Sequence, residues 1–264
     1  MTTFKDVATA GGLKVGTFVC EFATPGIGYI LKNAGLDFVF LDMEHSGFDV
    51  GQMKSVLRYF EAADLPCLVR PAGKDYYDMA RMLDIGAGAL CLPMVSSAEE
   101  ARAIVRQCRY VPEGERGVAL GIMHDRYSTG PVLQKLGQAN RETAIFPLIE
   151  TAAGVAEVEE IAKIDGVDGL WLGHFDLSCS LGIPGEFDHP AFKAAVARTC
   201  AAAKAAGIPV GRIAGDARDG AALHREGFDL IAISGDVWLL QAALAKAAGD
   251  LRQAVAATGE GPAS

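Results

Sequence analysis

The sequence predicts a single α/β domain folded as a (β/α)8 barrel, the TIM-barrel class, and three observations support this. The chain has 264 residues, a usual length for one such barrel. Short apolar runs rich in β-branched or aromatic residues alternate with helix-like stretches about eight times. A glycine follows several helix-like stretches, as at Gly35, Gly86, Gly207 and Gly227, where a left-handed capping residue is needed. An open, doubly wound parallel sheet is the alternative arrangement.

The apolar runs are short enough for buried strands, and the stretches between them are long enough for one helix each. We expect strands near residues 14–20, 37–42, 66–70, 89–93, 144–149, 168–172, 208–213 and 230–234. We expect helices near residues 51–63, 76–85, 97–108, 153–163, 190–206 and 217–226, with a long Ala/Leu-rich helix over 236–257.

One connection is longer than a barrel requires. Residues 110–143 separate the helix near 97–108 from the strand near 144–149. A connection of this length is usually functional, so we expect it to reach the active site or a subunit interface. The tail, 258–264, contains Gly, Pro and Ser and is expected to fray. No linker divides the chain, so residues 1–264 are expected to form one domain.

Composition narrows the functional class. The 24 Lys and Arg residues against 33 Asp and Glu give a net charge of −9, which argues against nucleic-acid or anionic-membrane binding. No apolar run approaches the roughly 18–20 residues of a membrane helix, and the N-terminus does not resemble a signal peptide. None of the six cysteines forms a CxxC pair. Reduced cysteines in a cytoplasmic protein are therefore expected.

Charged residues follow several predicted strands, at the edge where a barrel holds its active site. Glu150 follows the fifth strand and Asp176 lies just past the sixth. Neighbouring strand ends bring two such carboxylates within reach of one hard divalent ion, Mg²⁺ or Mn²⁺. Alternatively, each carboxylate caps the helix that follows it.

Other strand ends carry basic residues. His45 lies between acidic neighbours after the second strand, where it suits a general base, and a surface histidine is the alternative. Arg70 ends the third strand, where it suits an oxyanion or a substrate carboxylate, and a salt bridge to Asp42 or Glu44 is the alternative. Arg212 lies in the seventh strand.

Six segments in register resemble the HpcH/HpaI family of metal-dependent class II pyruvate aldolases. The likeness runs from about Gly16 to Trp238, nearly the whole chain. The segments are DMEHS, VRP, LDIGAGALCLPMV, RYVPEGERGV, the strand end Ile149-Glu150 and WLGHFDLSCSLGIPG.

The resemblance implies a barrel of the phosphoenolpyruvate/pyruvate-binding type. It implies reversible cleavage of a 4-hydroxy-2-oxo acid to pyruvate, or an analogue such as hydroxypyruvate, plus an aldehyde, through an enolate that Mg²⁺, Mn²⁺ or Co²⁺ stabilises. It also implies a homohexamer built from dimers that exchange their last helix. These small molecules and further copies of the chain are the expected partners.

By the same resemblance, Glu150 and Asp176 match the metal ligands. His45 matches an acid/base histidine, Asp84 matches the aspartate that pairs with it, and Arg70 matches the arginine that stabilises the enolate. The segment from Gly173 to Asp176 matches the one that receives the substrate carboxylate.

The sequence departs from the family at three places. His174-Phe175 replaces the usual Pro-Ala before the metal-binding aspartate, Phe18 stands where many members have Trp, and Leu148 stands where many have Gln. We expect Phe18, His174 and Phe175 to contact substrate and to set donor and acceptor specificity. For His174, the alternatives are a second acid/base group and a packed ring. The alternatives are oxaloacetate decarboxylation, a citryl- or malyl-thioester lyase on the same fold, and a barrel without catalysis.

Overall fold

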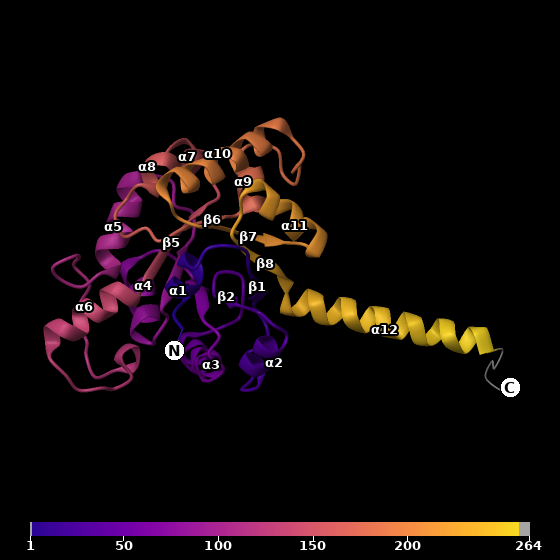
Figure 1. Ribbon diagram of the computed structural model, residues 1–264, viewed down its shortest axis with the longest axis horizontal. Helices are drawn as coiled ribbons and strands as arrows, with labels where there is room; N and C mark the ends of the chain where they lie inside the picture. Colours follow the sequence, from indigo (N-terminus) through magenta and orange to yellow (C-terminus); the bar gives the residue numbers. More distant parts are fainter. Residues whose placement is uncertain (1, 259–264) are drawn as a thin grey trace.

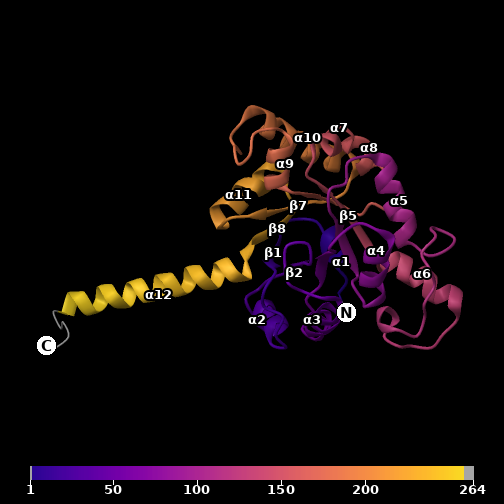
Figure 2. The same cartoon turned by 180° about the vertical axis from the view of Figure 1, so that it is seen from behind.

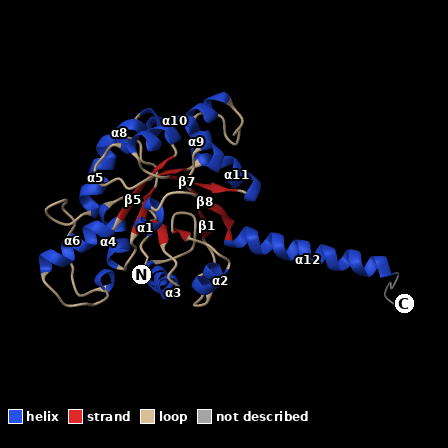
Figure 3. Ribbon diagram, in the orientation of Figure 1, coloured by secondary structure: helices blue, strands red, loops and turns tan. Residues whose placement is uncertain are grey.

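A computed structural model describes residues 2–258 of the chain, so the predicted frayed tail lies almost wholly outside the described residues. Eight parallel strands close a barrel in the order β1 to β8, which confirms the predicted fold class (Figures 1 and 3). The strands are β1 (Lys14–Val19), β2 (Phe38–Asp42), β3 (Cys67–Arg70), β4 (Ala89–Leu92), β5 (Ala144–Ile149), β6 (Leu170–Leu172), β7 (Val210–Ala214) and β8 (Leu230–Gly235).

Helices surround the barrel between successive strands. Glycines with left-handed φ angles of 70° at Gly207 and 110° at Gly227 end two of them, as the sequence predicts. The helices are α1 (Phe4–Thr9), α2 (Ile27–Asn33), α3 (Val50–Ala62), α4 (Tyr76–Asp84), α5 (Ala98–Cys108), the 3₁₀ turn η1 (Met123–Asp125), α6 (Val132–Glu142), α7 (Ala152–Ala156), α8 (Val158–Ala162), α9 (His174–Ser180), α10 (Pro190–Ala206), α11 (Ala217–Glu226) and α12 (Asp236–Thr258).

Predicted and observed strand ends agree within two residues, but one predicted helix is broken. The stretch 153–163 forms two short helices, α7 and α8, which meet at Glu157. Glu157 has φ of −110° and ψ of 10°, and its carboxylate accepts a hydrogen bond from Ala98 N at 2.7 Å. The side chain thus binds the first turn of the neighbouring α5.

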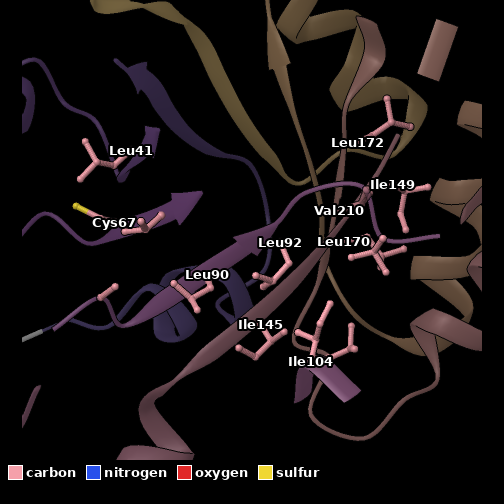
Figure 4. Packing of buried hydrophobic residues seen from close by; sticks show 14 of the residues in the cluster. Leu41, Cys67, Leu90, Leu92, Ile104, Ile145, Ile149, Leu170, Leu172 and Val210 are labelled. Carbon is pink, nitrogen blue, oxygen red and sulfur yellow. The ribbon is translucent and has the colours of Figure 1, made fainter. Parts of the chain in front are cut away.

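Two apolar layers position the site. Aromatic side chains fill the barrel interior, and Phe4 of α1 closes its lower end with ring centroids 5.6 Å from Phe38 and 5.4 Å from Phe146. The outer layer packs the strands against the helices (Figure 4). Its labelled members include Leu41, Cys67, Leu90, Leu92, Ile104, Ile145, Ile149, Leu170, Leu172 and Val210.

Residues 110–143 pack against α3 and α4. Arg116 donates to Asp84 at 2.6 Å, and Arg126 donates to Glu61 at 2.8 Å. Asp84 ends α4 and Glu61 lies in the last turn of α3, and these helices run back from the carboxyl ends of the strands. Gly117 N also donates to the hydroxyl of Tyr76, the first residue of α4, at 2.8 Å. That the segment serves the active site or a subunit interface stays a prediction.

The last helix leaves the barrel. α12 extends outward from the end of β8 in both views (Figures 1 and 2). Its exposed apolar residues include Trp238, Leu239, Leu240, Leu244 and Leu251. Among residues 2–258, no helix combines the length and the apolar character needed to cross a bilayer.

Candidate active site

Strand alternation directs a set of polar groups into one end of the barrel. Side chains on every second residue of a strand point to the same face. Each of the groups below lies two positions past an interior residue near the carboxyl end of its strand. The pairs are Phe40 with Asp42, Leu68 with Arg70, Leu148 with Glu150, and Trp171 with Gly173.

Arg70 is fixed by two carboxylates. Its Nε donates to Asp42 Oδ1 at 2.6 Å, and its Nη1 lies 3.0 Å from Glu44 Oε2. The guanidinium stands over the rings of Phe18 and Phe40, with Cζ 6.0 Å and 5.7 Å from their centroids. Burial opposes the charge, but the hydrogen bond and charge of Asp42 outweigh it and hold the pKa of Arg70 above its ordinary value. Arg70 is therefore a cation held in one orientation over the rings of Phe18 and Phe40.

Glu150 follows β5, two strands from Arg70 at the same barrel mouth, and is only 2% exposed. Its Oε1 accepts a hydrogen bond from Met94 N at 2.7 Å. Met94 has a left-handed φ of 54°, a strained conformation that serves to aim this N–H. Burial raises the pKa of Glu150 to about 7, the Met94 hydrogen bond opposes the shift, and the charge of Asp176 adds to it.

Gly173 allows the backbone to approach this carboxylate. A Cβ at Gly173 would overlap Glu150 Oε2. Asp176 lies in the first turn of α9, exposed to solvent, and acts on Glu150 through its charge. Among residues 2–258, no group of three or more His, Cys, Asp or Glu side chains forms a cation cage. A divalent ion here would therefore have two protein carboxylates.

His45 stands at the same mouth, with 65% of its side chain exposed. Its backbone N donates to Asp42 Oδ2 at 3.0 Å, and its Nε2 lies 4.0 Å from Glu44 Oε2. The expected pairing of His45 with Asp84 does not form within the chain. Asp84 instead accepts from Arg116 at the end of α4, which points away from the strand ends.

Two of the four residues that depart from the family pattern begin α9. His174 directly follows Gly173, and its ring centroid lies 5.3 Å from that of Phe187. Burial, with help from Arg212, lowers the pKa of His174 to about 4. Phe175 is 63% exposed and also packs on Phe187, at 5.2 Å. Both rings thus pack on Phe187, and their contact with substrate stays a prediction.

Phe18 does lie at the mouth. It is buried, stacks on Phe40 with centroids 5.6 Å apart, and contacts Trp238 of α12 at 5.9 Å. The ring forms part of the floor under Arg70.

Sequence reasoning missed two contributors. The Met94 N–H reaches Glu150 only because of a left-handed φ that nothing about methionine predicts. Asp236, 8% exposed, accepts backbone hydrogen bonds from Glu21 at 2.9 Å and Phe22 at 2.8 Å, and so ties the loop after β1 to the end of β8. Its position at the start of a helix after a strand was the available signal.

Comparisons with known proteins agree with this geometry. Residues 15–243 match the family model described as HpcH/HpaI aldolase/citrate lyase. The chain is 34% identical over 246 residues to a hydroxypyruvate/pyruvate aldolase of Sagittula stellata, covering 93% of this chain and 96% of the relative. It is 41% identical over 220 residues to one from Paraburkholderia phytofirmans, covering 80% and 84%.

A solved structure gives the same result. The HpcH/HpaI aldolase from Desulfitobacterium hafniense DCB-2 superposes with a TM-score of 0.88 at 31% identity, covering 96% of this chain and 97% of that one. The match spans the whole barrel and includes the segments that carry Arg70, Glu150 and Asp176. The chain therefore belongs to the HpcH/HpaI aldolase/citrate lyase family and is a carbon–carbon lyase.

Proposed function

We propose that this lyase reversibly cleaves a 4-hydroxy-2-oxo acid to pyruvate or hydroxypyruvate plus an aldehyde, and that it requires a divalent metal ion. The observation that carries the proposal is that Glu150, Asp176 and the fixed Arg70 cation lie at one barrel mouth, where the charges of Asp176 and Arg70 act on Glu150. The relatives named hydroxypyruvate/pyruvate aldolase support this choice of donor.

The residues present fit a metal ion. Glu150 is buried near a second carboxylate, and among residues 2–258 its carboxylate accepts a single hydrogen bond, from Met94 N. Such a pair holds surplus negative charge that Mg²⁺, Mn²⁺ or Co²⁺ would neutralise through hard oxygen ligands. When bound, the ion would supply a Lewis acid that stabilises negative charge at the 2-oxo group.

The chain's own groups supply the remaining steps. Arg70 places a fixed positive charge where the enolate oxygen develops, and the backbone from Gly173 to Asp176 would receive the substrate carboxylate. His45 Nε2 would take the proton of the C4 hydroxyl as the C3–C4 bond breaks. The electron pair of that bond passes into the enolate, C4 leaves as the aldehyde, and protonation at C3 completes pyruvate.

The testing experiment is proton exchange at C3 of pyruvate in D2O, followed by NMR. Metal-stripped protein should show no exchange, and added Mn²⁺, Mg²⁺ or Co²⁺ should restore it. Glu150→Gln should abolish both exchange and metal binding, whereas Glu160→Gln, on the exposed face of α8, should leave both unchanged. Metal-independent exchange, or a fully active Glu150→Gln variant, would contradict the proposal. Hydroxypyruvate in the same assay identifies the preferred donor.

A second copy of the chain is the occupant we propose for α12. The helix leaves the barrel with Leu239, Leu240 and Leu244 exposed at 44%, 47% and 61%. An exposed apolar patch of this kind marks an interface. Light scattering should show a homo-oligomer, a hexamer by family resemblance, and Leu240→Glu with Leu244→Glu should reduce it to smaller species. The six free cysteines are consistent with the cytoplasmic location that we propose.

A further inference from the structure

Arg212 places a charge in the apolar layer outside the barrel. It lies on β7 between Val210 and Ala214, which point outward into the packing between strands and helices. Residues 211 and 213 alternate with it and face the barrel interior. Arg212 therefore does not reach the mouth, although its place in the seventh strand suggested that it would. Its side chain is directed toward α10 and α11, and the residue is only 7% exposed.

The guanidinium of Arg212 forms no close ion pair among residues 2–258, although the carboxylates of Asp219 and Glu226 line the same cavity. Across residues 2–258, Arg212 makes no ion pair or hydrogen bond, and its buried Nε lacks an acceptor. Arg58 and Arg116 also have a buried Nε without an acceptor, but each holds a carboxylate, Glu61 or Asp84, through another nitrogen. Nη1 and Nη2 are not among the buried atoms without a partner, so the free end of the guanidinium reaches the cavity, while burial of the rest of the group disfavours its charge. An anion in the cavity would offset that cost.

A cavity of about 370 Å³ lies at Arg212. Its walls are apolar side chains of α10 and α11, chiefly Phe192, Val196 and Leu223, and Phe187 closes one side. The ring centroid of Phe192 lies 5.7 Å from Arg212 Cζ. A pocket with apolar walls and one charged group matches the usual form of a small-molecule site.

The cavity's other charges restrict the ligand. Lys193 is paired with Asp188 at 2.7 Å, and Asp219 accepts from Gly215 N at 2.8 Å, so these groups are already engaged at the exposed side. Asp219 and Glu226 add negative charge around the opening. They would repel a dianion such as phosphate far more than a single carboxylate. The guanidinium binds a planar carboxylate through two parallel hydrogen bonds.

We propose that this cavity, the Arg212 pocket, binds a small organic monocarboxylate with an aromatic or branched apolar body. The carboxylate pairs with Arg212, and the body packs on Phe192, Val196 and Leu223. The pocket is separate from the barrel mouth because β7 lies between them. His174 and Phe175, which replace the family's usual pair, pack on the Phe187 wall of this pocket.

The test uses 4-fluorophenylacetate as the probe, titrated into metal-stripped full-length protein at neutral pH and followed by ¹⁹F NMR. Charge-assisted pairing contributes about 1.5–3 kcal/mol, so Arg212→Met should weaken binding by about 10- to 100-fold. The neutral 4-fluorophenylacetamide should bind wild type more weakly by a similar factor. Arg70→Met should bind the probe as wild type does, which separates the pocket from the barrel mouth.

A second variant guards against a general folding defect. Ala222→Phe leaves Arg212 in place but fills the cavity from α11, and it should also block binding. Thermal unfolding establishes that each variant is folded. The proposal is overturned by undetectable binding to wild type at millimolar probe, by equal binding of the amide, or by loss of binding in Arg70→Met with retention in Arg212→Met.

Discussion

The guanidinium Nε of Arg70 lies 2.6 Å from Oδ1 of Asp42, and both side chains are buried at the mouth of the barrel. Nη1 is engaged by Glu44 at 3.0 Å. Among residues 2–258, no acceptor is hydrogen-bonded to Nη2. Asp42 and Glu44 thus hold Nε and Nη1 of the Arg70 guanidinium, and Nη2 stays available to a substrate oxygen.

Arg70→Lys should therefore lower the rate of pyruvate C3 exchange by about 10²- to 10³-fold, the usual effect of removing one positioned oxyanion donor. A lysine ammonium cannot hold both carboxylates and still present a donor in the same place. The measurement is initial exchange rate at saturating metal, with metal affinity determined in parallel. Metal affinity should change little. An exchange rate within twofold of wild type would show that the planar geometry of the Arg70 guanidinium is unimportant.

Asp42→Asn tests the carboxylate that holds Arg70 in place, rather than Arg70 itself. Asp42 accepts from Arg70 Nε, from Glu44 N at 3.1 Å and from His45 N at 3.0 Å. An amide nitrogen in place of one oxygen would face a donor and leave the buried Arg70 short of a counter-charge. We expect a loss of about 3–5 kcal/mol in unfolding free energy together with a large fall in exchange. Denaturant unfolding monitored by circular dichroism measures the first quantity, and a stability equal to wild type would contradict the role of Asp42.

Gly173→Ala should inactivate the enzyme without unfolding it. A Cβ at this position would lie 2.3 Å from Glu150 Oε2 and 2.8 Å from Glu150 Cβ, so the whole Glu150 side chain must shift. Gly88→Ala is the matched control, because a Cβ there meets nothing within 4 Å. We expect at least about a 10²-fold fall in exchange for the first variant, the effect typical of misplacing a catalytic group. Equal metal affinity and activity in the two variants would show that the close approach has no function.

Thiol reactivity should separate one cysteine from the rest. Cys179 is exposed, whereas burial raises the pKa of Cys108 to about 12, and burial followed by the charge of Asp236 raises the pKa of Cys20 to about 12. Because only the thiolate reacts, labelling by iodoacetamide at pH 8 should modify Cys179 first. Labelling of Cys20 should then accelerate about tenfold per pH unit below its pKa. Mass spectrometry identifies the sites, and fast labelling of Cys20 at pH 8 would contradict this environment.

The same shifts set a direction for stability against pH. The folded-state pKa of Cys108 lies above the ordinary thiol value of 9.0, so the unfolded chain releases the proton first. The contribution of Cys108 to stability is complete below pH 9 and is lost as pH rises toward 12. Unfolding midpoints measured from pH 8 upward should fall, and Cys108→Ala should fall less steeply. Equal slopes for the two proteins would show that Cys108 is not the group responsible.

Much of the barrel mouth follows from alternation along the strands. Residues two positions apart on a strand point to the same face. Phe40 and Leu148 face the barrel interior, so Asp42 and Glu150, two positions further along, face it too. The alternation ends with the strand: His174 already begins α9, so the count along β6 does not fix the direction of its ring.

The remainder depends on tertiary contacts that no local pattern encodes. Met94 adopts a left-handed φ because Glu150 accepts its N–H, and Asp84 pairs with Arg116 across 32 residues of sequence. Arg212 has the charge expected of a mouth residue, and only the register of β7 against β6, with Leu172 opposite Arg212, shows that it faces outward.

The burial of Arg212 also leads to a prediction about stability that does not depend on any ligand. Without ligand, burial lowers the pKa of Arg212 more than the charges of Asp219 and Glu226 raise it, and its Nε has no acceptor. Arg212→Met should therefore raise the unfolding free energy by about 1–3 kcal/mol. Arg109→Met is the matched control, because Arg109 is 4% exposed and donates to Asp168 at 3.0 Å and to the carbonyl of Thr143 at 2.7 Å. Breaking that buried pair should lower stability by about 3–5 kcal/mol.

Thermal unfolding of the two variants beside wild type measures both changes, since about 1 kcal/mol moves the midpoint of a chain this size by roughly 2–4 °C. If Arg212→Met were destabilised as much as Arg109→Met, then Arg212 would have a protein partner in solution, with Asp219 or Glu226 the candidates that line its cavity. A midpoint that rises in Arg212→Met and no longer responds to 4-fluorophenylacetate would show that the same charge which weakens the empty fold is the one that binds the ligand.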